Sequence, residues 1–271
     1  MAQNTELQER YSSLVEAKLR ATSVFASLFN NRYEGQPKAG AVKVPVRAEA
    51  TVGDYDISNG GTLATPTTTY ATIVTDKDNY VNELIDGYAA SAVPDGLVAD
   101  RLDSAGFALA DKIDVMLAAQ LVSEGTPVTG SGTASTKSNI YSNIIDAIQT
   151  AAALKVNKTE MKLAISNGAY GLLLKSDEFV RATAGDLDRF GAGFVGLLGG
   201  VPVYETPNLP ANTEFVLFNS AFCHYVAEWA VPVAVNDLAD GTHIGASAVQ
   251  GRQVWGSLIS KPATVLYRKS A

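Results

Sequence analysis

The feature that most constrains the fold is the stretch of residues 95–124, whose apolar positions keep a helical period without interruption. Apolar side chains recur every three or four residues, at Val98, Leu102, Ala105, Leu109, Ile113 and Met116. Pro94 and Asp95 suit the first turn of a helix, and Gly125 suits its end. At about 1.5 Å per residue the helix would be roughly 45 Å long, whereas a compact chain of this length has a radius of gyration of about 18 Å. We therefore expect one helix to run across nearly the whole molecule.

Two strand-like stretches separated by turn residues predict a long β-hairpin that follows an N-terminal arm. Residues 1–33 have a helical apolar period and form the predicted arm. In residues 41–50 valine alternates with polar residues or proline, and residues 67–75 are rich in threonine. The segment between them offers little to bury the ribbon against its own chain, and an isolated two-stranded ribbon is marginal in water. We therefore expect the hairpin to lie on another surface, which a neighbouring copy of the chain would supply.

The second half of the chain alternates helical and strand-like patterns, which predicts a second lobe with a mixed sheet. A loop rich in Gly, Ser and Thr at residues 125–138 introduces it. The predicted order is helix 139–154, strand 161–166, helix 168–175, a glycine-rich loop at 185–200, strand 201–205 and strand 214–219. Beyond residue 222 the chain is rich in β-branched and aromatic residues, which indicates strands that return to the first lobe.

Composition narrows the class of protein. Hydrophobic residues make up 46% of the chain and charged residues 18%, which excludes general disorder. No apolar run is long enough to cross a bilayer, and the N-terminus lacks the apolar core of a signal peptide, so we expect a cytoplasm-like compartment and no membrane partner. The net charge of −7 argues against a general nucleic-acid binder. Basic residues outnumber acidic ones in residues 1–43 and 252–271, so we expect the ends to pack against acidic surfaces of the same or a neighbouring subunit.

Gly191, Gly193 and Gly196 match the dinucleotide-binding pattern G-x-G-x-x-G. That pattern binds a pyrophosphate only where a strand precedes it and a helix follows, so that helix amides face the phosphates. Neither element is predicted around these glycines. An α/β nucleotide-binding enzyme that uses Gly191–Gly196 is therefore the less favoured alternative, and a loop is the preferred interpretation.

Other reactive residues form no recognisable catalytic or metal-binding set. Cys223 and His224 are adjacent, but neighbouring side chains of a strand point to opposite faces, so a buried cysteine and a structural histidine are expected. The spacing of the two histidines fits no zinc signature. Asp111 and Asp114 are spaced as a carboxylate pair, yet both fall on the polar face of the predicted helix. We therefore predict no catalytic, cofactor-binding or metal-binding residue, no cofactor, and no enzyme.

Two segments resemble a known family. Residues 196–210 (GLLGGVPVYETPNLP) are similar to the pattern G-x-L-x-G-x-P-V-x-x-(S/T)-x-x-(L/M)-P of major capsid proteins of tailed bacteriophages, through Gly196, Leu198, Gly200, Pro202, Val203, Thr206, Leu209 and Pro210. The closing pattern G-x-x-V-(Y/W)-G-x-x-(I/V)-x-x-P of many such coats is matched by Gly251, Val254, Trp255, Gly256, Ile259 and Pro262. Together with the order of arm, hairpin and long helix, these segments extend the resemblance to the Hong Kong 97 type capsid proteins over nearly the whole chain.

The resemblance implies an α+β protein with the Hong Kong 97 type capsid fold. Its parts would be an N-terminal arm, an extended β-hairpin loop, a peripheral domain that includes the spine helix at 95–124, and an axial domain. The implied ranges are 1–41 for the arm, 42–80 for the extended loop, 81–137 with 221–271 for the peripheral domain, and 138–220 for the axial domain.

The resemblance also implies a function. Copies of the chain would assemble as hexamers and pentamers into an icosahedral shell that encloses double-stranded viral DNA without reading its sequence. Assembly would take place in the host cytoplasm with separate scaffolding and portal proteins, while the presence of decoration proteins stays open. The product would be the capsid of a virion. An encapsulin-type compartment, which shares the fold but holds an enzyme cargo, is the main alternative.

Charged and exposed residues of the predicted hairpin, helix and C-terminus are the candidate contacts between subunits. They are Asp54, Tyr55, Asp56, Asp111, Asp114, Arg252, Arg268 and Lys269. Some members of the family crosslink their subunits through a lysine and an asparagine. No lysine lies between Arg47 and Thr75 in this hairpin, so we predict no such crosslink.

Overall fold

A computed structural model describes residues 20, 23–31, 40–47, 49–87, 97–176, 193–238, 242 and 244–270. Within these ranges the helices are α1 (Phe25–Leu28), α3 (Leu97–Glu124), α4 (Ile140–Ala153) and α5 (Asn167–Leu174), with short 3-10 turns at η2 (Lys158–Glu160) and η3 (Pro262–Thr264). The strands are β1 (Ala41–Arg47), β2 (Thr68–Val74), β3 (Lys77–Ile85), β4 (Thr126–Pro127), β5 (Met161–Ile165), β6 (Phe194–Leu198), β7 (Val201–Glu205), β8 (Thr213–Asn219), β9 (Cys223–Asp237), β10 (Ser247–Ile259) and β11 (Leu266–Lys269).

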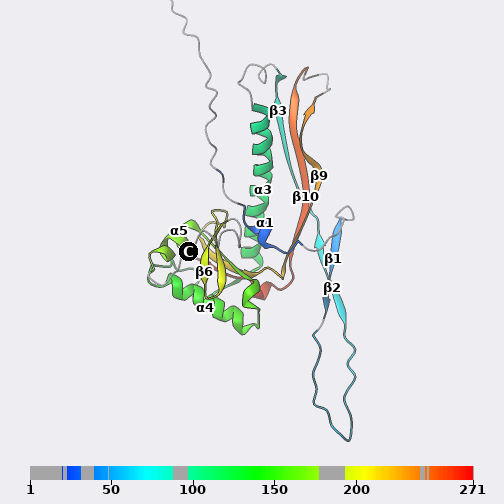
Figure 1. Ribbon diagram of the computed structural model, residues 1–271, viewed down its shortest axis with the longest axis vertical. Coiled ribbons are helices and arrows are strands. Elements are labelled where there is room, and N and C mark those ends of the chain that lie inside the picture. Colours follow the sequence, from blue (N-terminus) through cyan, green and yellow to red (C-terminus); the bar gives the residue numbers. More distant parts are fainter. Residues whose placement is uncertain are drawn as a thin grey trace, which may run out of the picture.

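The long helix and a three-stranded sheet form an elongated body (Figure 1). α3 has 28 residues, about 42 Å at 1.5 Å per residue, and begins at Leu97. The predicted helix is thereby confirmed from that residue to Glu124, whereas Pro94 and Asp95 lie outside the described residues. Beside α3, the antiparallel strands β3, β10 and β9 lie in that order. Ile85, Ala105 and Val249 are buried between the helix and the sheet. The apolar stripe of α3 therefore packs on the sheet, as its helical period predicts.

The second lobe is a six-stranded mixed sheet in the order β4-β11-β8-β5-β7-β6, with α4 and α5 packed on it. Every residue of β8 is buried, because both faces of this sheet are covered. On one face Val216 and Phe218 pack in the same cluster as α1 and α3. On the other face Phe215 and Leu217 pack in the cluster that contains α4 and α5. The predicted helix 139–154, the predicted helix 168–175 and the strands between and after them are confirmed to within two residues.

The C-terminal strand β11 belongs to the six-stranded sheet and not to the three-stranded one. β11 pairs antiparallel with β8 and parallel with β4, so the end of the chain joins the six-stranded sheet. The prediction that the strands after residue 222 return to the first lobe is therefore correct for β9 and β10 and wrong for β11. The reason is hydrophobic burial: Val265 lies in the buried cluster that contains α1 and α3, and Leu266 lies in the cluster that contains α4 and α5.

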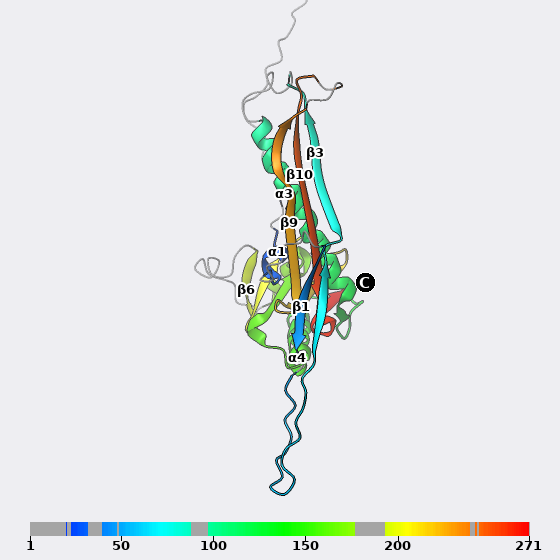
Figure 2. The ribbon, with the colours of Figure 1, turned by 90° about the vertical axis from the view of Figure 1, so that its right-hand side faces the viewer.

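β1 and β2 form the predicted hairpin, which extends well beyond the body in both views (Figures 1 and 2). They pair antiparallel over seven residues, from Ala41 with Val74 to Arg47 with Thr68. Of the predicted N-terminal helix, only α1 and its flanks fall within the described residues. This short piece does not lie free, because Val24 and Phe25 are completely buried in the chain's own core.

Candidate assembly surfaces

The part of the hairpin beyond its paired strands has no core of its own. All described side chains from Glu49 to Tyr70 are exposed, with Gly60 alone half-buried. Three large apolar side chains stand almost wholly in solvent: Val52 at 93%, Ile57 at 95% and Leu63 at 95% exposure. Monomeric proteins expose single apolar residues often but seldom gather them on a projecting ribbon. The expectation that little of the chain buries this ribbon is confirmed.

The tip of the hairpin is nevertheless ordered by a local turn. The Asp56 carboxylate accepts hydrogen bonds from the backbone amides of Ser58 at 2.6 Å and Asn59 at 3.3 Å. The Gly60 amide donates to the Asp56 carbonyl at 2.7 Å, and Gly60 has φ +72°, a conformation that favours glycine. The amide donors, that of Ser58 first, hold the pKa of Asp56 below its usual value. Asp56 therefore shapes the turn, while Asp54 and Tyr55 remain exposed beside it.

The base of the hairpin is fixed on the outer face of the long sheet. Val44 and Ile73 are buried against Val226 of β9. At Gly256 of β10 an added Cβ would lie 2.2 Å from the Val74 carbonyl oxygen, so only glycine lets the end of β2 cross the sheet this closely. Gly256 belongs to the closing sequence pattern, and this crossing is its physical reason.

The rest of that outer sheet face is uncovered and carries polar pairs as well as exposed apolar side chains. The Arg252 guanidinium on β10 forms an ion pair with Asp78 on β3, with Nε 3.0 Å from each carboxylate oxygen. This pairing lowers the pKa of Asp78, chiefly through the hydrogen bond from Arg252. Gln250 donates to Asn82 at 3.1 Å in the next row. Tyr80 is 74% exposed between these pairs. Arg252 thus has a partner within its own sheet, although it remains on the surface as predicted.

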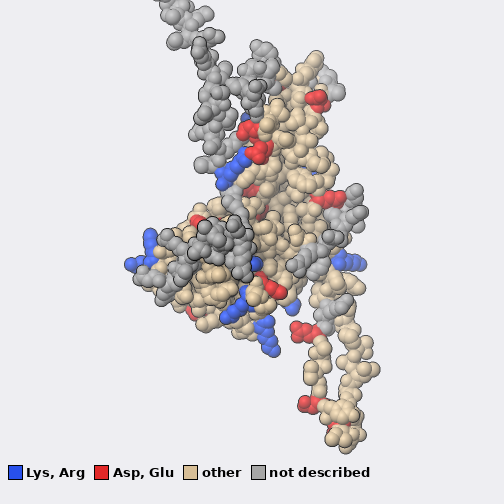
Figure 3. Space-filling view, in the orientation of Figure 1, with Lys and Arg blue, Asp and Glu red and all other residues tan. Residues whose placement is uncertain are grey.

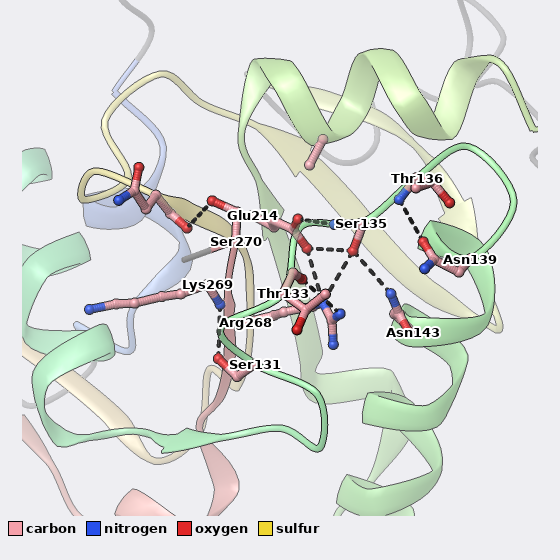
Figure 4. A network of polar contacts seen from close by, with 12 residues as sticks. Ser131, Thr133, Ser135, Thr136, Asn139, Asn143, Glu214, Arg268, Lys269 and Ser270 are labelled. Carbon is pink, nitrogen blue, oxygen red and sulfur yellow. Dashed lines mark hydrogen bonds and ion pairs between the residues drawn. The ribbon is translucent and has the colours of Figure 1, made fainter.

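Arg268 lies in the interior, at the centre of the polar network in Figure 4. Its Nε is 3.0 Å from Glu214 Oε2, and its Nη atoms donate to the carbonyls of Thr129 and Thr133 at 3.1 Å each. Ser135 donates its amide and hydroxyl to the two Glu214 oxygens at 2.6 and 2.5 Å. Arg268 is 4% exposed and Glu214 is 7% exposed. The prediction that Arg268 is a contact between subunits is therefore wrong, because each of its three guanidinium nitrogens bonds within the chain and ties β11 and the loop after β4 to β8.

Asp114 is also an interior residue, with no exposed surface. Its Oδ1 accepts from the amides of Val24 at 2.8 Å and Phe25 at 2.7 Å, and its Oδ2 accepts from Asn208 at 3.1 Å. Burial raises the pKa of Asp114, and these hydrogen bonds act against that rise. The expectation that Asp114 lies on a solvated or subunit-facing helix face is wrong, because α1 covers that face.

The two remaining candidate contacts between subunits, Asp111 and Lys269, are less buried than Arg268 and Asp114. Asp111 is half-buried and accepts from Asn208 Nδ2 at 2.9 Å. Lys269 is half-buried, with its Nζ 5.7 Å from the centre of the Tyr267 ring. Each has a contact within the chain and also a surface that another subunit could reach.

The glycine-rich segment forms a hairpin. Gly196 lies in β6 at a register shift against β7, and Gly199 and Gly200 connect the two strands with φ +59° and +87°. Two consecutive residues with positive φ make the tight turn that matches strand twist. Gly191 lies outside the described residues. No helix follows the described glycines, so the helix amides that a nucleotide site of this type needs are not supplied.

Cys223 and His224 are both buried, which confirms the structural interpretation of this pair. Burial raises the pKa of the Cys223 thiol and lowers the pKa of the His224 imidazole. His224 Nε2 lies 3.3 Å from Ser260 Oγ, a contact between β9 and the residue that follows β10. Among the described residues no group of three or more metal-ligating side chains comes together, and none of the helices within these ranges is both long and apolar enough for a bilayer.

Comparison with known proteins assigns the family. The model of the family described as phage capsid protein matches residues 69–267, most of the chain. The chain belongs to the phage capsid protein family. It is a structural protein of the phage capsid shell and not an enzyme, which removes the nucleotide-binding alternative. It assembles with copies of itself, and its place is the virion capsid.

Solved structures of phage proteins share the fold. A chain from Mycobacterium phage Che8 is 25% identical, with a TM-score of 0.79 and 99% of both chains covered. A chain of the capsid of cyanophage P-SCSP1u is 14% identical, with a TM-score of 0.76, covering 98% of this chain and 93% of that one. A chain of the mature capsid of bacteriophage PhiM1 is 17% identical, with a TM-score of 0.69, covering 97% of this chain and 91% of that one. No curated protein sequence matches this capsid protein.

Sequence reasoning missed the partners that define these surfaces. Asp78 and Asn82, which pair with β10, lie on one face of a strand whose alternation from Lys77 to Ile85 the sequence does contain. Glu214, the partner of Arg268, carries no comparable signal, since it is an isolated acidic residue in an apolar strand. A buried charge in such a strand does imply a partner, but the sequence does not say which.

Proposed function

We propose that this capsid protein builds a closed icosahedral shell of hexamers and pentamers around double-stranded DNA, in which each hairpin lies on a neighbouring copy. The observation that carries the proposal is the exposed apolar hairpin. Fully burying one aliphatic side chain stabilises by about 1.5–3 kcal/mol. Val52, Ile57 and Leu63 together therefore offer several kcal/mol to a contact that their own chain does not make.

The proposed division of labour follows the Hong Kong 97 type arrangement. The arm is residues 1–41, the extended loop 42–80, the peripheral domain 81–137 with 221–271, and the axial domain 138–220. The burial of α1 and the pairing of β11 with β8 support a close connection between the two domains. Exposed Asp54, Tyr55 and Asp56 at the hairpin tip are the favoured contacts with a neighbour, with Asp111, Arg252 and Lys269 as further candidates.

The charge pattern supports a container that does not hold its DNA tightly. The hairpin carries Glu49, Asp54 and Asp56 and no Lys or Arg between residues 48 and 76, as the red patches on the hairpin in Figure 3 show. Affinity for phosphate grows with each Lys or Arg contact, so an acidic protein leaves packaged DNA free to move. Separate scaffolding and portal proteins complete the proposal, with assembly in the host cytoplasm.

Particle size and content test the proposal. The purified protein, alone or with its scaffolding protein, should form large uniform closed particles by light scattering and negative-stain microscopy. Particles from infected cells should contain double-stranded DNA, whereas an encapsulin-type shell would contain an enzyme. A protein that stays a small oligomer under all these conditions would overturn the proposal. Boiled particles should run at monomer mass on a denaturing gel, since we also propose that this hairpin forms no covalent crosslink.

A further inference from the structure

The N-terminal residues 23–31 fill the space where the long helix meets the six-stranded sheet. The rings of Phe25 and Phe29 lie 6.1 and 5.9 Å from the ring of Phe218 on β8. The segment ends by pairing with β9: the Asn30 amide donates to the Cys223 carbonyl at 2.8 Å, and the Tyr225 amide donates to the Asn30 carbonyl at 3.1 Å. This short segment therefore touches both lobes, and Figure 1 shows α1 between them.

One buried carboxylate attaches this segment to the helix. The Asp114 carboxylate on α3 accepts hydrogen bonds from the amides of Val24 and Phe25 at 2.8 and 2.7 Å and from the hydroxyl of Ser23 at 3.1 Å. Asn208, which follows β7, donates to both Asp114 and Asp111. The same carboxylate thus joins the N-terminal segment, the long helix and the six-stranded lobe. Such a group is costly to bury unless its hydrogen bonds are made, so losing them would favour release of the whole contact.

The position of Asp114 along α3 makes this contact a brace. The C-terminal end of α3 is anchored separately, because the Thr126 amide donates to the Val265 carbonyl at 2.8 Å and Val128 donates to Tyr267 at 2.9 Å. Asp114 lies ten residues before Glu124, about 15 Å along the helix axis. Between these two points Leu117 and Leu121 also pack in the buried cluster that contains Phe218. The brace lies near the limit of this packed stretch that is farthest from the anchored end, so it has the greatest leverage on the angle of the helix.

We propose that residues 23–31 are a releasable brace that fixes the angle between α3 and the six-stranded sheet, and that detachment from Asp114 lets this angle change. The brace is a conformational device of the single chain. It rests on contacts within the subunit and not on the proposed shell geometry, so its failure would leave the proposed function untouched.

Distances between two spin labels test the brace in the full-length, unassembled chain. Cysteines placed at exposed Ala108 on α3 and Lys158 beside α4 report the angle between the lobes. Cysteines at Lys158 and Lys175 report the integrity of the six-stranded lobe alone. The native Cys223 can stay in place, since it is buried and its thiolate is disfavoured. The matched variants are Asp114→Ala and Asp111→Ala, because both aspartates accept from Asn208 and only Asp114 accepts from residues 23–31. Alanine is used because an asparagine oxygen could still accept the two amides.

The expected result is a broader distance distribution between Ala108 and Lys158 for Asp114→Ala than for the wild type and Asp111→Ala, with the distribution inside the lobe unchanged. Hydrogen exchange should show a loss of protection at the amides of Val24 and Phe25 in the same variant. Equal distributions in all three proteins would overturn the proposal. If Asp114→Ala also broadens the control pair, the double variant Phe25→Ala with Phe29→Ala replaces it, because it removes the packing of the segment on Phe218. An unchanged lobe angle there would overturn the proposal as well.

Discussion

The hairpin tip and strand β8 differ in how far their apolar side chains are buried within one subunit. All seven residues of β8 are buried, and its apolar side chains pack into two separate cores. In the hairpin, Ile57 and Leu63 are almost fully exposed and touch no core of the chain. The sequence of β8 is therefore set by the fold of one subunit, whereas our proposal is that the sequence of the hairpin tip is set by what the tip contacts in the assembly. Substitutions in the two regions should separate stability from assembly.

The largest loss of subunit stability is expected for Phe218→Ala. Phe218 has no exposed surface and packs against Phe25 and Phe29, so its removal leaves a cavity between α1 and the sheet. Truncation of a buried aromatic residue costs about 3–5 kcal/mol. Denaturant unfolding of the unassembled chain measures it. A loss below about 1 kcal/mol would mean that the site collapses on substitution, which would weaken the contrast with the hairpin.

Arg268→Met should lower stability almost as much, by about 3 kcal/mol, because it leaves the Glu214 carboxylate buried without its cation. The double variant Arg268→Met with Glu214→Leu is the matched control. It removes both charges, so it should recover part of the loss, although Ser135 then loses its acceptor. Chemical unfolding of both variants decides the matter. If the double variant is no more stable than the single one, the cost comes from lost packing rather than from the unpaired charge.

The sequence predicted the elements that have strong local patterns. The apolar period of α3, the period of α4 and the apolar runs of β7 and β8 are local properties, and the structure has each of them within two residues of the expected bounds or shares their end. Gly199 and Gly200 between two apolar runs are a hairpin signal that the sequence also carried. The segment was instead expected to be a loop, because its many glycines resemble a mobile turn.

What the sequence could not supply were contacts between distant residues. Asp114 follows the polar face of an amphipathic helix, and only the position of Phe25, 89 residues away, turns that face into a core. Arg268 and Glu214 are 54 residues apart and meet through strand pairing. Charge and periodicity therefore placed Asp114 and Arg268 on the surface, and tertiary packing overrode that local expectation.

Hairpin substitutions should reverse the pattern seen in the core. Ile57→Ser should leave the free energy of unfolding within about 0.5 kcal/mol, since the side chain is 95% exposed in the subunit. It should nevertheless reduce the yield of closed particles, which sedimentation and electron microscopy can measure. Ile244→Ser is the matched control, because Ile244 is 92% exposed and lies in the connection between β9 and β10, away from the hairpin. Equal assembly of Ile57→Ser and the wild type would contradict the role of the hairpin.

The smallest effect concerns the dependence of stability on pH at the junction of the two lobes. Burial lowers the pKa of His224 below its usual value, so the unfolded chain binds a proton more readily than the folded one. Stability from this residue is present above about pH 6.5, the usual histidine pKa, and is lost as the pH falls through the lower folded value. The free energy of unfolding should therefore decline between neutral and mildly acid pH, and His224→Gln should flatten that decline. The chain has two histidines, so a parallel His243→Gln variant measures the contribution of the other one. If the decline persists unchanged in His224→Gln, the imidazole is already accommodated as a cation, and the buried junction is less different from the exposed hairpin than its burial indicates.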